Sequence, residues 1–308
     1  MPATPAEPAT PVVLAHGLLG LLIGLGEVRL GPLRAGYFLG IDRAIAARGH
    51  PVLAPLVHPT GGIAARAAML KAQLLRGLDD LDRRGRLPAD GKCVLFGHSM
   101  GGLDCRHMLA HLGMADRVRA LVTVATPHRG SPVADWAARH IERQLSLTAQ
   151  LARFGFDLHA TRDLTADACR RFNQRTPDAP GVRYFSVSAG RPGAEVSPLL
   201  RWSERIVAAA EGLNDGLVSV ASAQWGTHWE TWPVDHFHTI NRRVVLGREA
   251  LHGEDIAPRW AGLLDRLAAE GLVEGPAARS GVRLSAAQNG AESANPVAGA
   301  ALESGVVA

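Results

Sequence analysis

A serine stands between glycines in the segment Gly97-His98-Ser99-Met100-Gly101, which follows a short hydrophobic run and precedes a segment with helical character. A tight turn from a strand into a helix leaves no room for flanking side chains, so glycine is needed there. The same turn strains the serine backbone and lifts the hydroxyl clear of the sheet, in front of a helix N-terminus. The pattern therefore predicts a serine nucleophile, with a glycine-rich turn and a capping serine as the alternative.

A nucleophilic serine needs a base, and the base needs a carboxylate that orients it. Where the serine sits on such a turn, the acid and then the base follow it in the chain. Asp215 lies in an Asn-Asp-Gly turn, and His236 comes about twenty residues later. Asp235, His228 and His238 lie in the same region, so these residues alone leave the acid and the base open.

The oxyanion that forms when a serine attacks a carbonyl group also needs hydrogen-bond donors. One is expected to be the backbone N–H of Met100, the residue after the serine, and the second should come from the loop at 16–20. His16 precedes the serine in the chain, so we expect it to shape this loop rather than act as the base.

The elements that would position these groups alternate along the chain. Hydrophobic runs predict strands at 11–17, 50–57, 92–97, 118–127 and 181–190, and helical patterns cover 37–50, 62–86 and the segment from 101 onward. This alternation is typical of crossover units, so the predicted fold class is α/β, with a mostly parallel sheet and helices on both faces.

Two regions depart from the alternation. Residues 128–176 lack a strand pattern and predict a mostly helical insertion, whose segment 136–156 mixes apolar and basic residues at helical spacing. We expect this insertion to form a lid over the site, the alternative being an insertion that only completes the core. The chain from 276 to 308 is small and weakly polar, which predicts a disordered tail after a domain that spans 1–275.

Composition excludes several classes of protein. The net charge of +4 comes from scattered arginines without a basic run, which argues against a nucleic-acid-binding stripe. Cys93, Cys105 and Cys169 show no CxxC spacing, so neither a disulfide framework nor a zinc ribbon is expected. Cys93 and Cys105 lie in apolar stretches and are expected to be buried core thiols rather than nucleophiles.

The start of the chain has neither a basic segment nor an apolar core of a signal peptide. The apolar run at 12–26 is too short to span a membrane and is interrupted by His16 and several glycines. We therefore expect a cytoplasmic protein, although secretion of a trimmed form stays open.

With these residues assembled, the chain resembles the α/β-hydrolase lipases of bacteria, particularly the true-lipase group. The shared segments occur in the same order and lie at 12–20, 95–108, 122–136, 171–190, 214–220 and 234–241. The resemblance implies an α/β-hydrolase fold with a helical lid insertion and a catalytic triad of Ser99, Asp215 and His236. It places the second oxyanion donor at Leu18, beside Met100.

The chain also departs from that group. Its members are typically exported, often carry a disulfide and often require a dedicated folding helper. Many bind a structural calcium through an aspartate two residues after the catalytic histidine, where this chain has His238, and Glu204 fits the other carboxylate position only loosely. Because imidazole is a poor calcium ligand, no calcium is expected. A structural zinc, found in a related group, has no matching insertion here.

The resemblance implies a serine hydrolase that cleaves carboxylic esters through an acyl-enzyme, as a lipase or esterase acting on acylglycerols or similar hydrophobic esters. The apolar loop at 18–26 favours a hydrophobic acyl pocket. We expect no metal or organic cofactor, no nucleic acid and no obligate protein partner, with transient contact to a lipid surface. Alternatives with the same residues are an acyltransferase, a thioesterase, a polyester hydrolase, a non-catalytic binding protein and a membrane-surface protein.

Overall fold

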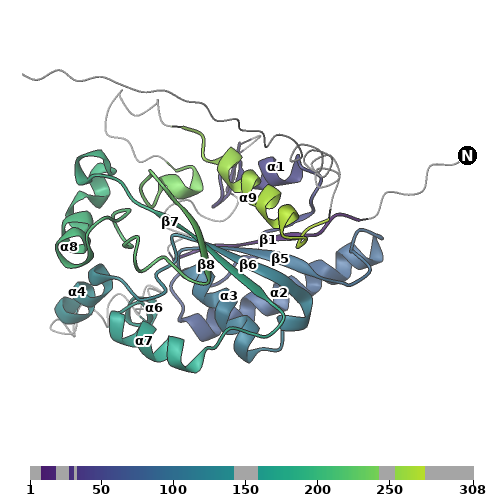
Figure 1. Cartoon of the computed structure of the whole chain (residues 1–308), viewed down its shortest axis with the longest axis horizontal. Coiled ribbons are helices and arrows are strands. Elements are labelled where there is room, and N and C mark those ends of the chain that lie inside the picture. Colours follow the sequence, from purple (N-terminus) through teal and green to yellow (C-terminus); the bar gives the residue numbers. More distant parts are fainter. Residues whose placement is uncertain (1–7, 19–27, 31–32, 142–158, 243–253, 275–308) are drawn as a thin grey trace, which may run out of the picture.

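The computed structural model describes residues 8–18, 28–30, 33–141, 159–242 and 254–274. Its centre is a six-stranded sheet in the order β4-β1-β5-β6-β7-β8, and every neighbouring pair in it is parallel (Figure 1). The strands are β1 (Val12–Ala15), β4 (Val52–Leu53), β5 (Cys93–His98), β6 (Val118–Val124), β7 (Arg183–Ala189) and β8 (Thr227–Trp232). A separate antiparallel pair is formed by β2 (Val28–Leu30) and β3 (Leu33–Ala35).

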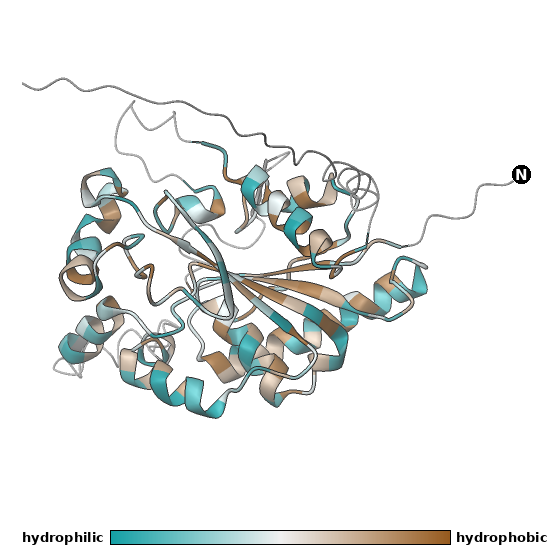
Figure 2. Ribbon diagram, in the orientation of Figure 1, coloured by the Kyte–Doolittle hydropathy of each residue, from teal (hydrophilic) through white to brown (hydrophobic). Residues whose placement is uncertain are grey.

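Helices cover both faces of the sheet, as the sequence predicts. In Figure 1, α1 (Ile41–Ala46) and α9 (Ala257–Ala269) lie over one face, and α2 (Ile63–Arg83) and α3 (Met100–His111) over the other. Parallel strands between two helical layers are buried on both sides, which explains the continuous apolar runs of β1 and β5. The brown strands of Figure 2 run between helices whose outward faces are teal.

Each helical layer packs an apolar stripe onto the sheet. On α2, Ala67, Leu70, Leu74 and Leu78 recur at helical spacing and are buried in the same cluster as the side chains of β1 and β5 that face this helical layer. On the opposite face, Trp260 of α9 lies at the centre of a cluster that includes the rings of Phe38, Phe96 and Trp232.

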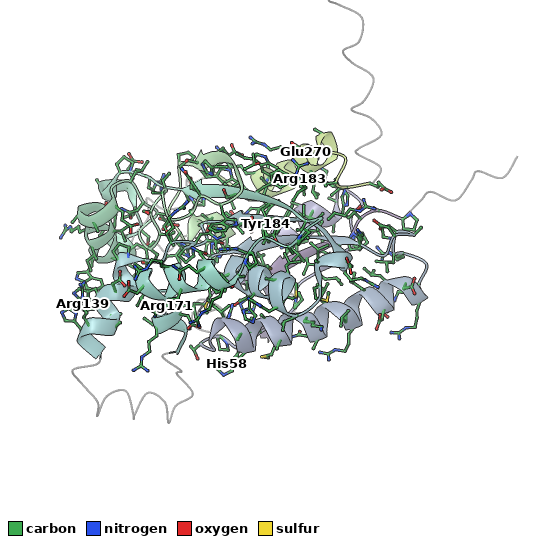
Figure 3. All side chains as sticks on the ribbon, turned by 60° about the horizontal axis from the view of Figure 1, so that its bottom comes forward. His58, Arg139, Arg171, Arg183, Tyr184 and Glu270 are labelled. Atoms are coloured by element: carbon green, nitrogen blue, oxygen red, sulfur yellow. The ribbon has the colours of Figure 1, made fainter. Side chains whose placement is uncertain are left out.

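Four further helices lie together at one end of the molecule, to the left in Figure 1. They are α4 (Pro132–Ile141), α6 (His159–Asp163), α7 (Ala166–Arg175) and α8 (Arg201–Glu211). Short 3₁₀ helices occur at Ala115–Arg117, Gly193–Glu195, Pro198–Leu200 and His238–Ile240. Arg183 of β7 forms an ion pair of 3.1 Å with Glu270, the residue that caps the C-terminus of α9 (Figure 3).

The expected α/β class and the five expected strands are confirmed; four strands are shorter than expected, and the strand expected at 92–97 is shifted by one residue to Cys93–His98. The strand expected at 50–57 is reduced to Val52–Leu53, because prolines at 51 and 55 cannot donate to a neighbouring strand. The helix expected at 37–50 begins only at Ile41, since Gly40 adopts a left-handed conformation (φ 74°). Strand β8 and helices α8 and α9 were not predicted.

The insertion at 128–176 contains α4, α6 and α7, but 142–158 and most of the segment proposed as a lid lie outside the described residues, as does the tail at 276–308. The three cysteines are free and buried, as expected for Cys93 and Cys105. None of the described helices is both long and apolar enough to span a membrane.

Candidate active site

Ser99 occupies the turn between β5 and α3, and its backbone angles are φ 52° and ψ −133°. The backbone of a residue other than glycine rarely adopts these angles, and holding it there costs about 1–3 kcal/mol. The surrounding structure enforces the conformation through the Ser99 N–H, which donates to Val124 O, and the Ser99 carbonyl, which accepts from Thr126 Oγ1. The hydroxyl therefore stands at the N-terminus of α3 in a fixed orientation.

The flanking glycines are required by space. A Cβ at Gly97 would lie 2.6 Å from Gly102 Cα, and one at Gly101 would strike the Ala15 carbonyl oxygen. Helix α3 thus crosses the end of β1 at a distance that no larger residue permits, as the sequence pattern predicts.

The structure brings the three expected catalytic side chains together. His236 Nε2 lies 3.1 Å from Ser99 Oγ, and His236 Nδ1 lies 2.6 Å from Asp215 Oδ2. The carboxylate accepts, so Nδ1 carries the proton and Nε2 is left to accept from the serine hydroxyl. All three residues are buried, which strengthens these polar contacts relative to water.

Asp215 is held from several sides. Its Oδ1 accepts from the backbone N–H groups of Leu217 (2.9 Å) and Val218 (2.7 Å), which leaves Oδ2 for the imidazole. Its own carbonyl accepts from the His236 N–H at 2.8 Å. The Asn-Asp-Gly turn is fixed by Asn214 Oδ1, which accepts from the Gly216 N–H at 2.7 Å.

These groups converge because parallel strands present their carboxyl ends at one edge of the sheet. Ser99 follows β5, and His236 follows β8, four residues after Trp232. Asp215 lies in the loop between α8 and β8. Ser99, Asp215 and His236, which are far apart in the chain, thus form one compact cluster.

The two residues expected to hold the oxyanion lie beside the serine. Met100 is the first residue of α3, so its N–H has no partner within the helix. Leu18 packs against the apolar cluster that contains Met100. A Cβ added to Gly17 would approach Ser99 Cβ to 2.7 Å, so this loop passes directly over Ser99. The loop at 19–27, on which the expected acyl pocket depends, lies outside the described residues.

The competing residues have other partners. Asp235 accepts from the backbone N–H groups of Ser197 and His238. His238 Nε2 contacts the Glu254 carbonyl oxygen at 2.6 Å, and His228 contacts the hydroxyls of Ser186 and Ser188. None of these contacts involves the hydroxyl of Ser99.

His16 shapes its loop, as expected. Its Nδ1 lies 2.8 Å from the Gly17 carbonyl oxygen, and its Nε2 accepts from the Val57 N–H at 3.0 Å. Burial, followed by the nearby Arg66 guanidinium, lowers the pKa of His16 to about 4. The ring therefore stays neutral at physiological pH.

A buried ion pair that was not predicted supports the same loop. Arg66 of α2 and Asp104 of α3 are both buried, with Arg66 NH2 2.8 Å from Asp104 Oδ2. The guanidinium also donates to the carbonyl oxygens of His16 and Gly17. A signal existed in the sequence, because Arg66 interrupts the apolar stripe of its helix beside Ala67 and Leu70.

No group of three or more metal-ligating side chains is found in the described part of the chain. His238 is occupied by the Glu254 carbonyl, and Glu204 packs so closely on Gly193 that a Cβ there would meet its carboxylate.

Comparisons with known proteins agree with this architecture. The family model described as PGAP1-like alpha/beta domain matches residues 73–223, a range that includes Ser99 and Asp215. Triacylglycerol lipase 2 of Saccharomyces cerevisiae is 30% identical over 220 residues, which cover 70% of this chain and 65% of the yeast protein. The chain thus spans slightly less than two thirds of the length of this curated relative.

Solved structures share the fold. The mature form of a Bacillus licheniformis lipase is 24% identical, covers 77% of this chain and 88% of its own, and superposes with a TM-score of 0.56. A carboxyl esterase from a metagenome is also 24% identical and covers 85% and 76%, with a TM-score of 0.63. The architecture of the chain and its similarity to these lipases and esterases agree with an α/β-hydrolase fold.

Proposed function

We propose that this protein hydrolyses carboxylic esters of hydrophobic acids through an acyl-enzyme, with Ser99 as nucleophile, His236 as general base and acid, and Asp215 as the orienting carboxylate. The observation that carries the proposal is the continuous pair of contacts from Asp215 through His236 to Ser99, at 2.6 and 3.1 Å. The strained serine backbone at the end of β5 supports it.

In the acylation step, Ser99 Oγ attacks the ester carbonyl carbon while its proton passes to His236 Nε2. The tetrahedral intermediate then collapses, the bond to the alcohol oxygen breaks, and Nε2 delivers the proton to the leaving alcohol. Asp215 keeps the ring in the tautomer whose Nε2 can accept and stabilises the imidazolium. In deacylation, Nε2 takes a proton from water while the water oxygen attacks the acyl carbon. The second intermediate then collapses, the bond from the acyl carbon to Ser99 Oγ breaks, the acid leaves, and Nε2 returns the proton to Oγ.

The oxyanion of both intermediates would accept from the backbone N–H groups of Leu18 and Met100. A donor of this kind contributes about 3 kcal/mol to the stabilisation of the transition state. The close approach of Gly17 to Ser99 and the position of Met100 at the start of α3 support this assignment.

The substrate we propose is an acylglycerol or a similar hydrophobic ester. The yeast relative is named a triacylglycerol lipase, which favours this class. An exposed apolar surface supports transient contact with lipid: Trp202 of α8 is 53% exposed, Leu199 is 63% exposed, and the Trp202 ring packs edge-on against Trp136 of α4 at 4.5 Å. Indole rings favour the boundary between water and lipid.

A series of nitrophenyl esters of increasing acyl length, supplied to the wild type and to Ser99→Ala and His236→Ala variants, tests the proposal. We expect both variants to lose at least about a thousandfold in kcat/KM. The matched control is Ser188→Ala, because Ser188 is also a buried serine whose hydroxyl contacts an imidazole, that of His228, at 3.4 Å. This control should keep its activity.

Covalent labelling by a fluorophosphonate gives an independent measure. We expect a single adduct on Ser99 in the wild type and in Ser188→Ala, and none in Ser99→Ala. An unlabelled wild type that binds nitrophenyl esters without turnover would contradict the proposal and indicate a binding protein.

A further inference from the structure

A run of hydrogen bonds passes beside the Ser99 turn and joins two other parts of the site. The Gly17 N–H donates to Tyr37 Oη at 3.1 Å, and Tyr37 Oη lies 2.8 Å from His98 Nδ1. His98 Nε2 lies 2.7 Å from Thr239 Oγ1, and the Thr239 hydroxyl donates to the His236 carbonyl oxygen at 2.6 Å. One end is thus in the loop before Leu18 and the other on the backbone of the proposed base.

The two ends fix the direction of every bond in this run. An amide N–H can only donate and a carbonyl oxygen can only accept. The Tyr37 hydroxyl must therefore donate to His98 Nδ1, and His98 must carry its proton on Nε2 and donate to Thr239. The opposite tautomer would leave the Tyr37 hydrogen and the His236 carbonyl without these partners.

Burial keeps the run in this state. His98 and Thr239 are buried, and burial, followed by the nearby His236 and His16, lowers the pKa of His98 well below its ordinary value. Burial likewise raises the pKa of Tyr37, so its hydroxyl keeps the proton that it donates. Thr239 is held further by its carbonyl, which accepts from Trp260 Nε1 of α9 at 2.7 Å.

We propose that Tyr37, His98 and Thr239 are positioning residues for acyl transfer, which set the distance of the His236 imidazole and of the 17–18 loop from Ser99. His98 is adjacent to the nucleophile in the chain, and its ring centroid lies 4.9 Å from that of His236. The inference rests on the proposed function and deepens it, because a base and an oxyanion loop act only when both are held at the correct distance and orientation relative to the same serine.

The test removes one hydroxyl at a time. In Tyr37→Phe and in Thr239→Val, kcat for a nitrophenyl ester is expected to fall roughly 10- to 100-fold, since small misplacements of catalytic groups have effects of this size. KM should stay within about threefold, because the run contacts catalytic groups rather than substrate. Thr239→Ser keeps the hydroxyl and should restore kcat.

The double variant Tyr37→Phe/Thr239→Val provides a sharper readout. Each single change already breaks the same run, so the combined loss in kcat should be smaller than the product of the two single losses. Independent effects that multiply would contradict a shared run.

The second of the two tyrosines in the chain, Tyr184, provides a matched control for Tyr37. Tyr184 lies on β7 (Figure 3), in the apolar cluster that includes residues of α2 and α3, and its hydroxyl accepts from the Ala179 N–H at 2.9 Å. Tyr184→Phe removes this oxygen. Thr176→Val removes a buried hydroxyl that contacts His111 at 3.2 Å. Both controls are expected to lower the free energy of unfolding and leave kcat unchanged.

Two results separate the possible failures. Full kcat in Tyr37→Phe and Thr239→Val, with Ser99→Ala inactive, overturns this inference and leaves the proposed function intact, whereas an active Ser99→Ala overturns the proposed function itself. If a variant fails to fold, ¹⁵N NMR of the wild type still decides, because a proton on His98 Nδ1 instead of Nε2 would overturn the assigned direction.

Discussion

Replacing Asp215 by asparagine should convert the imidazole of His236 into the tautomer that carries its proton on Nε2 instead of Nδ1. In the wild type, Oδ1 accepts two backbone N–H groups, from Leu217 and Val218, and Oδ2 accepts one N–H from the ring. Asparagine has a single carbonyl oxygen, which the two amides would retain because two hydrogen bonds outweigh one. The new NH₂ group would then face Nδ1 and force that nitrogen to accept.

The size of the effect follows from this geometry. With Nδ1 as acceptor, Nε2 carries the proton and cannot accept from the Ser99 hydroxyl at 3.1 Å. The corresponding substitution in a serine protease lowers kcat about 10⁴-fold through the same tautomer change, and we expect a similar loss here. At 1.36 kcal/mol for each factor of ten, this is about 5 kcal/mol of transition-state stabilisation.

The assay combines single-turnover acylation by a nitrophenyl ester with ¹⁵N NMR of the histidine rings, assigned with a His236→Gln variant. The acylation rate should collapse while the free energy of unfolding changes little, and the His236 resonances should report a proton on Nε2. A matched control is Asp90→Asn, which neutralises an exposed carboxylate paired with Arg119 and should leave acylation unchanged. Retention of more than about a tenth of the wild-type rate, with the Nε2 proton present, would refute the reasoning.

Other predictions concern the scaffold of the site. Arg66→Met leaves the buried Asp104 carboxylate without its cation and should lower the free energy of unfolding by about 3–5 kcal/mol in urea titrations, and a loss below about 1 kcal/mol would contradict this. Gly101→Ala places a Cβ against the β1 backbone and should abolish labelling by a fluorophosphonate, whereas Gly262→Ala, which meets no atom within 4 Å on helix α9, should stabilise the protein by about 0.5–1 kcal/mol. Folding lowers the pKa of His16 to about 4, so the folded protein binds fewer protons at this ring than the unfolded chain does. The contribution of His16 to the free energy of unfolding is therefore complete above pH 6.5 and is lost as the pH falls toward 4. Urea titrations between these pH values should show a fall of about 3 kcal/mol from His16, and a stability independent of pH there would contradict the assignment.

The parts of the site that the sequence predicts are those written into short local patterns. Ser99 depends on a strand, a turn and a helix that are contiguous in the chain, and steric demands at its flanking glycines leave little freedom in the choice of residues. Asp215 and His236 were open among competitors on local grounds, and only the likeness of longer segments to a known family separated them. The structure then brings both side chains to the serine.

The missed elements have identifiable causes. Strand β8 reads THWETW and lies at the edge of the sheet, so its side chains are only partly buried and show no clean alternation. Helix α9 does carry a helical signal, since Trp260, Leu263, Leu264 and Leu267 form one buried stripe. The hydrogen-bonded run from Tyr37 through His98 to Thr239 joins residues 61 and 141 positions apart, and no local pattern encodes such a meeting.

The position of Trp260 on α9 affects the order in which the parts of the site form during synthesis of the chain. Thr239 receives a hydrogen bond from this ring, which also packs on Phe96 of β5 and Phe38 before α1. Chains leave the ribosome from the N-terminus, so the serine turn emerges long before the last described helix. In a nascent chain, the Ser99 turn would therefore form before the Trp260 hydrogen bond that holds Thr239, because that bond requires α9 to dock.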